Sequence, residues 1–304
     1  MKKKHELRIG LSISIWLIIL IFLRTDTFPQ TKGWEDVEKV FGKKGTVQDG
    51  VFKITYPRLD LKVKVGNFTV APGLALTAWI GFIKNTNKGM DMGDNTMMMG
   101  DMVLLDKEVA PVISKLVSEN LKITALHNHI IGETPTIKYM HFSGMGNAVK
   151  LAESIKSVLS ITGTPLSSPM MQSKKENPDW SKVIAVLGPS GKQNGDLLQY
   201  GFPRNEKLTE SGMEIPAYLG MATGVNFQME GNKAAITGDF VLLADEVNPV
   251  VQALTENGIA VTAIHNHMLY DNPRLFMLHF WAVNDPGKLA VGIKAALDKT
   301  NSKK

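Results

Sequence analysis

Alternating apolar and polar positions predict short strands separated by amphipathic helices. Residues 51–56 and 61–65 alternate as half-buried strands do, and residues 34–41 have the apolar spacing of a short helix that ends at Gly42. Further along come an apolar strand near residue 102, a helix over 111–119, two more strands and a helix over 147–160. This order predicts an α+β core of strand, helix, strand, strand and helix.

The same pattern returns 138 positions later without a gap. Val103-Leu104-Leu105 recurs as Val241-Leu242-Leu243, Thr124-Ala125 as Thr262-Ala263, and His141-Phe142 as His279-Phe280. We therefore predict a tandem duplication, with pseudo-twofold mixed-sheet domains over residues 31–163 and 179–304 and a linker over 164–178.

Helix ends are predicted from single residues. Pro111 and Pro249 are expected in the first turn, where a missing N–H does no harm, with Asn248 as an N-cap. Asn120 and Gly258 follow the two helices and tolerate the left-handed conformation that stops a helix.

Six of the seven histidines lie in the repeats, and each set of three has the form His-x-His, eleven residues, then His. Strand alternation places both histidines of a pair on one face, and an antiparallel hairpin would bring the third beside them. Three imidazoles with open coordination positions suit a divalent metal, with zinc expected and iron, manganese or copper as alternatives. The other interpretation is hydrogen-bonded histidines at a sheet end. The predicted ligands are His127, His129, His141, His265, His267 and His279.

Four acidic residues also recur between the copies. Glu108 and Glu246 are the candidates for a catalytic role, as general base, fourth ligand or partner of a ligand. Asp101 and Asp239 could take the same roles, but Gly-Asp before a strand favours a turn.

A methionine-rich stretch over residues 89–100 distinguishes the first copy. Thioethers suit Cu(I), but the favoured interpretation is a loop whose methionines pack against the domain. The second copy has one methionine at the matching place, which argues against a shared copper function.

Charge and cysteine content exclude several classes of protein. Residues 1–30 hold five of the basic and two of the acidic side chains, so the net charge of +5 falls to +2 over the remaining chain, and nothing indicates a nucleic-acid partner. The absence of cysteine excludes disulfides and thiolate ligands.

The N-terminal stretch indicates export. Three lysines and Arg8 precede a 15-residue apolar run, which is the layout of a signal peptide or an N-terminal anchor over residues 1–30. We therefore expect an extracytoplasmic protein that contacts membrane only through this segment.

Three blocks carry a resemblance to a known family. Residues 238–251, 261–267 and 273–281 resemble the bacterial LppY/LpqO family, a domain of unknown function named after lipoproteins. The resemblance implies export and a paired-domain layout but no reaction. The absence of cysteine departs from the lipoprotein members and excludes a cysteine-linked lipid anchor. The histidine spacing is also similar to that of acetolactate decarboxylase and related folds, where such a triad holds zinc.

The sequence thus predicts a metal-binding protein, with a metal-dependent hydrolase or lyase acting on a small molecule as the leading hypothesis. The alternatives are a non-catalytic metal- or ligand-binding module and a structural envelope protein. An enzyme predicts an enclosed cleft with a carboxylate near the histidines, a carrier predicts exposed histidines, and a structural protein predicts imidazoles bonded to backbone.

Overall fold

The computed structural model describes residues 31–85, 95–167 and 177–303. The predicted signal or anchor over 1–30 lies outside the described residues, as do Met90, Met92 and most of the predicted linker. No helix in the described ranges is long and apolar enough to cross a membrane.

The first repeat forms a six-stranded sheet of order β1-β2-β5-β6-β9-β7 and a small sheet of order β4-β3-β8. Its elements are α1 (Glu35–Phe41), β1 (Thr46–Gln48), β2 (Val51–Pro57), β3 (Val63–Val65), β4 (Phe68–Val70), α2 (Pro72–Ala75), β5 (Thr77–Lys84), β6 (Thr96–Leu105), α3 (Asp106–Ser118), β7 (Lys122–His127), β8 (Glu133–Thr134), β9 (Ile137–Gly146) and α4 (Ala148–Leu159).

The second repeat forms a six-stranded sheet of the same order, β10-β11-β14-β15-β18-β16, and a small sheet of order β13-β12-β17. Its elements are α5 (Ser181–Leu187), β10 (Lys192–Asn194), β11 (Leu197–Pro203), β12 (Thr209–Glu210), β13 (Met213–Glu214), η1 (Ala217–Leu219), β14 (Ala222–Glu230), β15 (Lys233–Leu242), α6 (Ala244–Glu256), β16 (Ala260–His265), β17 (Asp271–Asn272), β18 (Phe276–Asn284) and α7 (Pro286–Leu297).

The matching strand orders confirm the duplicated α+β fold. Every strand pairing in the described ranges is antiparallel. The sheets are therefore purely antiparallel, whereas mixed sheets were predicted. The reason is local, because β9 returns alongside β7 as a hairpin and then pairs with β6 on its other side.

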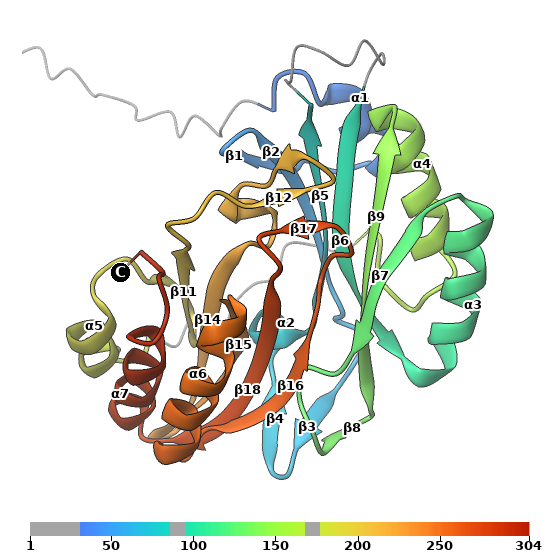
Figure 1. The fold of residues 1–304 in the computed structure, drawn as a ribbon. Coiled ribbons are helices and arrows are strands. Elements are labelled where there is room, and N and C mark those ends of the chain that lie inside the picture. Colours follow the sequence, from blue (N-terminus) through green and yellow to red (C-terminus); the bar gives the residue numbers. More distant parts are fainter. Residues whose placement is uncertain (1–30, 86–94, 168–176, 304) are drawn as a thin grey trace, which may run out of the picture. The chain divides into compact units, whose positions relative to one another are not determined.

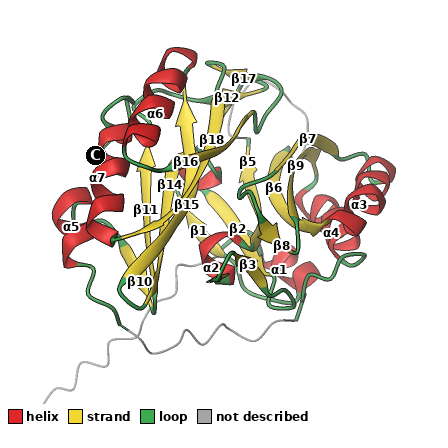
Figure 2. Ribbon diagram, turned by 90° about the horizontal axis from the view of Figure 1, so that it is seen from below, coloured by secondary structure: helices red, strands yellow, loops and turns green. Residues whose placement is uncertain are grey.

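The described residues are arranged in layers, with helices on the two outer sides and the sheets between them (Figures 1 and 2). The first sheet is covered by α1, α3 and α4, and the second by α5, α6 and α7. The inner faces of the sheets are turned toward each other, so what lies on them is enclosed by both copies.

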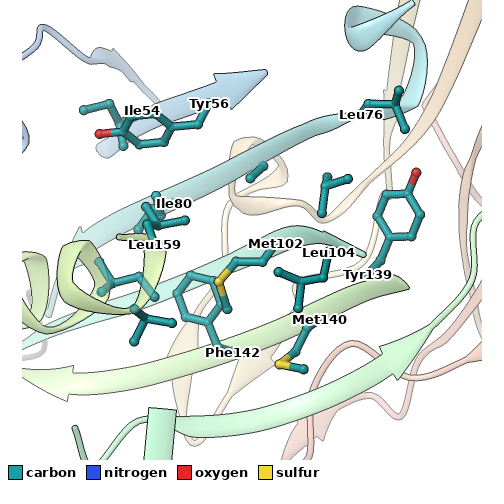
Figure 3. Close-up of a cluster of buried hydrophobic side chains, with 14 of the residues drawn as sticks. Ile54, Tyr56, Leu76, Ile80, Met102, Leu104, Tyr139, Met140, Phe142 and Leu159 are labelled. Atoms are coloured by element: carbon teal, nitrogen blue, oxygen red, sulfur yellow. The ribbon is translucent and has the colours of Figure 1, made fainter. Parts of the chain in front are cut away.

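Each sheet packs its outer face on its helices through an apolar core. In the first repeat Met102 and Leu104 of β6 and Met140 and Phe142 of β9 are almost fully buried, in one apolar cluster with Leu159 of α4 (Figure 3). Full burial of such side chains contributes about 1.5–3 kcal/mol each, which makes the helix–sheet contact the main source of stability within a repeat.

The copies are joined by a mixed apolar and polar interface. Met97 and Met99 of the first repeat belong to one buried cluster with Val241 and Met277 of the second. Hydrogen bonds cross the same interface, including one of 2.6 Å from Thr262 Oγ1 to the His129 carbonyl. The repeats are therefore packed as one body rather than tethered.

Strand β6 corrects two expectations. It begins at Thr96, so Met97, Met98 and Met99 are buried strand residues rather than loop residues. Gly100 and Asp101 lie in the middle of the same strand, and the predicted turn is wrong. Strand β6 accommodates the buried Asp101 beside His129 and His141 of the same repeat.

Helices α3 and α6 begin earlier than predicted, at Asp106 and Ala244, so the expected N-cap at Asn248 is wrong and both prolines lie inside the helices. The predicted stops are confirmed, since Asn120 has φ 55° and Gly258 has φ 69°.

Gly238 on β15 is required by close packing. A methyl group there would clash with the carbonyl oxygen of Gly224 on β14 and lie 2.9 Å from the ring of Phe280. We expect Gly238→Ala to lower the free energy of unfolding by about 2 kcal/mol or more. Gly201→Ala is the matched control, because its methyl group would meet only Ala222 at 4.0 Å. Denaturant unfolding measures both, and equal stability of the two variants would contradict the packing argument.

Candidate metal centre between the repeats

The six repeat histidines gather in one cluster between the two sheets. His127 stacks on His265 with ring centroids 3.5 Å apart, and two further cross-repeat pairs stack at 3.8 Å, His129 on His279 and His141 on His267. The two predicted triads therefore form a single centre on the pseudo-twofold axis.

The antiparallel pairing of neighbouring strands positions the histidines of each repeat in this cluster. His127 ends β7, and His141 on the antiparallel strand β9 pairs with Ala125, two residues before His127. A register shift between Ile123 and Ala125 marks an irregularity in β7 just before the histidines. The second repeat copies this geometry, with His265 ending β16 and His279 paired with Ala263.

Backbone carbonyls orient the imidazole rings. His279 Nδ1 lies 2.8 Å from the Gly238 carbonyl oxygen, His265 Nδ1 lies 3.0 Å from that of Asn266, and His127 Nδ1 lies 3.3 Å from that of Asn128. A protonated Nδ1 in such a bond leaves the Nε2 lone pair free, which is the usual arrangement of a metal-binding histidine.

The Nε2 atoms of all six histidines are buried and have no hydrogen-bond partner within the described ranges. Potential ligand atoms of His127, His129 and His141 lie within 4.8 Å of one another, and so do those of His127, His265, His267 and His279. These groups could hold a metal ion.

Asp101 and Asp239 face the same cluster from β6 and β15. Asp101 oxygens lie 3.9 Å from Nε2 of both His129 and His141. Asp239 oxygens lie 3.2 Å from His267 Nε2 and 3.9 Å from His279 Nε2. One oxygen of each carboxylate is buried without a hydrogen-bond partner among the described residues, so both can serve as further ligands.

Burial shifts the pKa values in the cluster toward the neutral forms. Burial, reinforced by the neighbouring His265 ring, lowers the pKa of His127 to about 3, and burial lowers that of His265 to about 4. Burial likewise holds the pKa values of the other four histidines well below the ordinary value and raises those of Asp101 and Asp239 well above it. Neutral imidazole is the form that binds a metal ion.

A cavity of about 240 Å³ opens beside the cluster. Both aspartates and four of the histidines line it, together with Trp79, Thr77, Asn226 and Thr237. No lysine or arginine is among its lining residues, so a small uncharged polar molecule, or an anion that binds the metal directly, fits its chemistry.

The two halves of the centre differ in residues that the sequence interpretation missed. Tyr139 stacks on His129 with centroids 3.4 Å apart and donates a hydrogen bond to the Ala75 carbonyl, whereas Met277 holds the matching position in β18. Trp79 pairs with Asp101, whereas Gly224 pairs with Asp239. Strand alternation could have found Tyr139, since it lies two residues before His141.

Glu108 does not line the cavity, and its carboxylate is occupied elsewhere. It accepts hydrogen bonds from Arg58 at 2.9 and 3.3 Å, from the Leu105 N–H and from the Gly163 N–H. Burial raises its pKa, but these hydrogen bonds outweigh burial and hold the pKa below its ordinary value.

Glu246 repeats this arrangement in the second copy. It accepts from Arg204 at 2.6 and 2.9 Å, from the Leu243 N–H and from the Asn301 N–H. The contacts of both glutamates are those of buried ion pairs that also cap α3 and α6. Their catalytic role stays a prediction, and the aspartates are the acids beside the histidines.

Comparison with known proteins places the repeats in a family. The profile described as Domain of Unknown Function (DUF1259) matches residues 35–161 and again residues 181–299. No curated protein matches the sequence.

Similarity to solved structures is weak. The regulatory subunit of aspartate kinase from Thermus thermophilus is 11% identical, with 67% of this chain and 92% of that chain covered and a TM-score of 0.20. The trimeric microcompartment shell protein PduB is 11% identical, with 84% and 89% covered and a TM-score of 0.21. EtuB from Clostridium kluyveri is 8% identical, with 73% and 87% covered and a TM-score of 0.20. Such low scores carry no inference.

The arginine–glutamate pairs predict acid sensitivity. A hydrogen bond from Arg204 lowers the pKa of Glu206 from 4.5 to about 2. Because the folded-state pKa is depressed, this pair stabilises the protein above about pH 4.5 and loses its contribution as the pH falls toward 2. Glu206→Gln should remove roughly 2 kcal/mol at pH 7 and flatten the fall in stability between pH 5 and 2. Unfolding at several pH values tests this, and an unchanged slope would contradict it.

Proposed function

This chain belongs to the family described as Domain of Unknown Function (DUF1259), and from that premise we propose that it is an extracytoplasmic metal-binding protein whose centre serves a hydrolase or lyase reaction on a small molecule. Zinc is the proposed ion, because an all-nitrogen set with neighbouring carboxylates suits it.

One observation carries this proposal. Six imidazole nitrogens and two carboxylate oxygens are buried together without partners in the described part of the chain. An unsatisfied buried polar atom costs about 1–3 kcal/mol, so a cluster of eight is expensive unless something binds there. A divalent cation satisfies such donors at once.

The enclosure of the centre favours a reaction over simple carriage. His141, His267 and His279 are buried, and Asp101 and Asp239 share the cavity with them. A metal carrier would expose its ligands for exchange. A purely structural role would pair both nitrogens of each ring, whereas here the Nε2 atoms have no hydrogen-bond partner among the described residues.

The chain's own residues supply binding and proton transfer. A bound divalent ion supplies Lewis-acid polarisation of a carbonyl or ester oxygen. Once ionised, Asp101 or Asp239 would take a proton from a substrate group in the cavity or complete the ligand set. Trp79 and Thr77 form the wall that orients a small substrate and limits entry of water.

Export is supported by the basic residues and the 15-residue apolar run of the N-terminal stretch. The resemblance to the LppY/LpqO family supports the same location and the paired-domain layout. Nothing in the charge of residues 31–304 favours a nucleic acid.

The protein should bind one or two equivalents of zinc, measured by elemental mass spectrometry after loading and desalting. Excess zinc should also raise the unfolding free energy, by about 2.7 kcal/mol at 100 times the Kd. Replacing His265, His267 and His279 with alanine should abolish most of both effects, with Glu206→Gln as a control that keeps them.

Circular dichroism of the metal-free variants checks that they fold. A folded wild-type protein that takes up no zinc, copper, iron or manganese would exclude the proposed function.

A further inference from the structure

His127 is the histidine shared by the two potential ligand groups. Its ligand atom lies within 4.8 Å of those of His129 and His141, and equally within 4.8 Å of those of His265, His267 and His279. The rings confirm this central position, since centroids of His141 and His279 both lie 5.1 Å from that of His127, on opposite sides of the pseudo-twofold axis.

We propose that the two ion sites of this centre are unequal, because His127 of the first repeat is a ligand of the ion that the second-repeat histidines bind. The tight site consists of His265, His267 and His279 with His127 from the other copy. The second site consists of His129, His141 and Asp101. This inference rests on the proposed function, since it assigns ligands within the same centre.

Ligand chemistry explains why His127 binds the ion of the second repeat and not that of its own. Its Nδ1 faces the Asn128 carbonyl, so the ring offers one lone pair, at Nε2, and can bind one ion at a time. Zinc in a protein prefers four tetrahedral ligands. With His127, the second triad provides four nitrogen ligands. The reverse assignment, in which His265 binds the ion of the first repeat, is not available, because His265 belongs to one ligand group only.

The remaining ligands make a different kind of site. Asp101 oxygens lie 3.9 Å from Nε2 of both His129 and His141, which is a set of two histidines and one carboxylate. Such a set leaves coordination positions open, and all three residues line the cavity. Four nitrogens fill the tetrahedral positions of the first site, although His267 and His279 also line the cavity, while the second site keeps positions open for a substrate.

The packing around each site agrees with this division. Tyr139 stacks on His129 at 3.4 Å and 6° between planes, so it positions a ligand of the open site. The second repeat has Met277 at that position, while the cross-repeat stacks of His129 on His279 and of His141 on His267 are common to both copies.

Two single variants of the first-repeat triad test whether His127 is a ligand of the second-repeat ion. The full-length metal-free protein is titrated with Zn²⁺ against a competing chelator, and with Co²⁺ followed by visible absorption, which reports coordination. Wild type should bind one tight and one weaker equivalent. His129→Ala should lose the weaker equivalent and keep the tight one. His127→Ala should weaken the tight equivalent by about tenfold or more and change the Co²⁺ spectrum.

Independent triads predict another result, in which His127→Ala and His129→Ala behave alike and the second repeat keeps its tight ion in both. That outcome would refute the assignment of His127 to the second-repeat ion and leave metal binding intact. A wild-type protein that binds no metal would refute the proposed function itself. His127→Gln, which keeps most of the side-chain volume, replaces His127→Ala if that variant does not fold.

Discussion

The structure depends on the enclosure of polar groups between two apolar sheets. Six imidazoles and two carboxylates lie where the inner faces meet, with their remaining donors and acceptors unpaired among the described residues. Burial disfavours the charged forms, so the pKa values of the imidazoles are lowered and those of the two carboxyl groups are raised. Unpaired buried polar groups destabilise a fold, so stability does not explain this arrangement. The cluster is therefore the reason to interpret the interface between the repeats as the functional part of the molecule.

Each repeat separates its acids into two structural environments. Glu108 and Glu246 are neutralised by buried arginines and hold the first turns of α3 and α6. Among the described residues, Asp101 and Asp239 have histidines rather than arginines as ion-pair partners, and they project from long strands. Removing a partner from a buried ion pair leaves an uncompensated charge, so each arginine and its glutamate stabilise the fold only as a pair, and the two pairs form a scaffold. That scaffold supports the strands from which the aspartates project.

Duplication supplied two copies of one triad, and packing them face to face made their surroundings unequal. A symmetric pair on a twofold axis must place equivalent atoms near each other, as His127 and His265 show with a ring distance of 3.5 Å. Small differences then decide how ions are shared. Tyr139 and Trp79 of the first repeat stand where the second repeat has Met277 and Gly224, so the two halves of the centre differ in their aromatic neighbours. Such asymmetry lets one site hold an ion and the other meet a substrate.

The amino-acid sequence by itself determined what depends on neighbours along the chain. The repeat, the order of strands and helices, the left-handed stops at Asn120 and Gly258, and the shared face of each His-x-His pair all follow from local spacing and backbone preference. Only the tertiary structure decided that the two triads form one centre, that Asp101 belongs to a strand facing them, and that Glu108 binds Arg58 instead. Periodicity tells which face a side chain occupies, but the surface opposite that face comes from the other copy, more than 100 residues away in the chain.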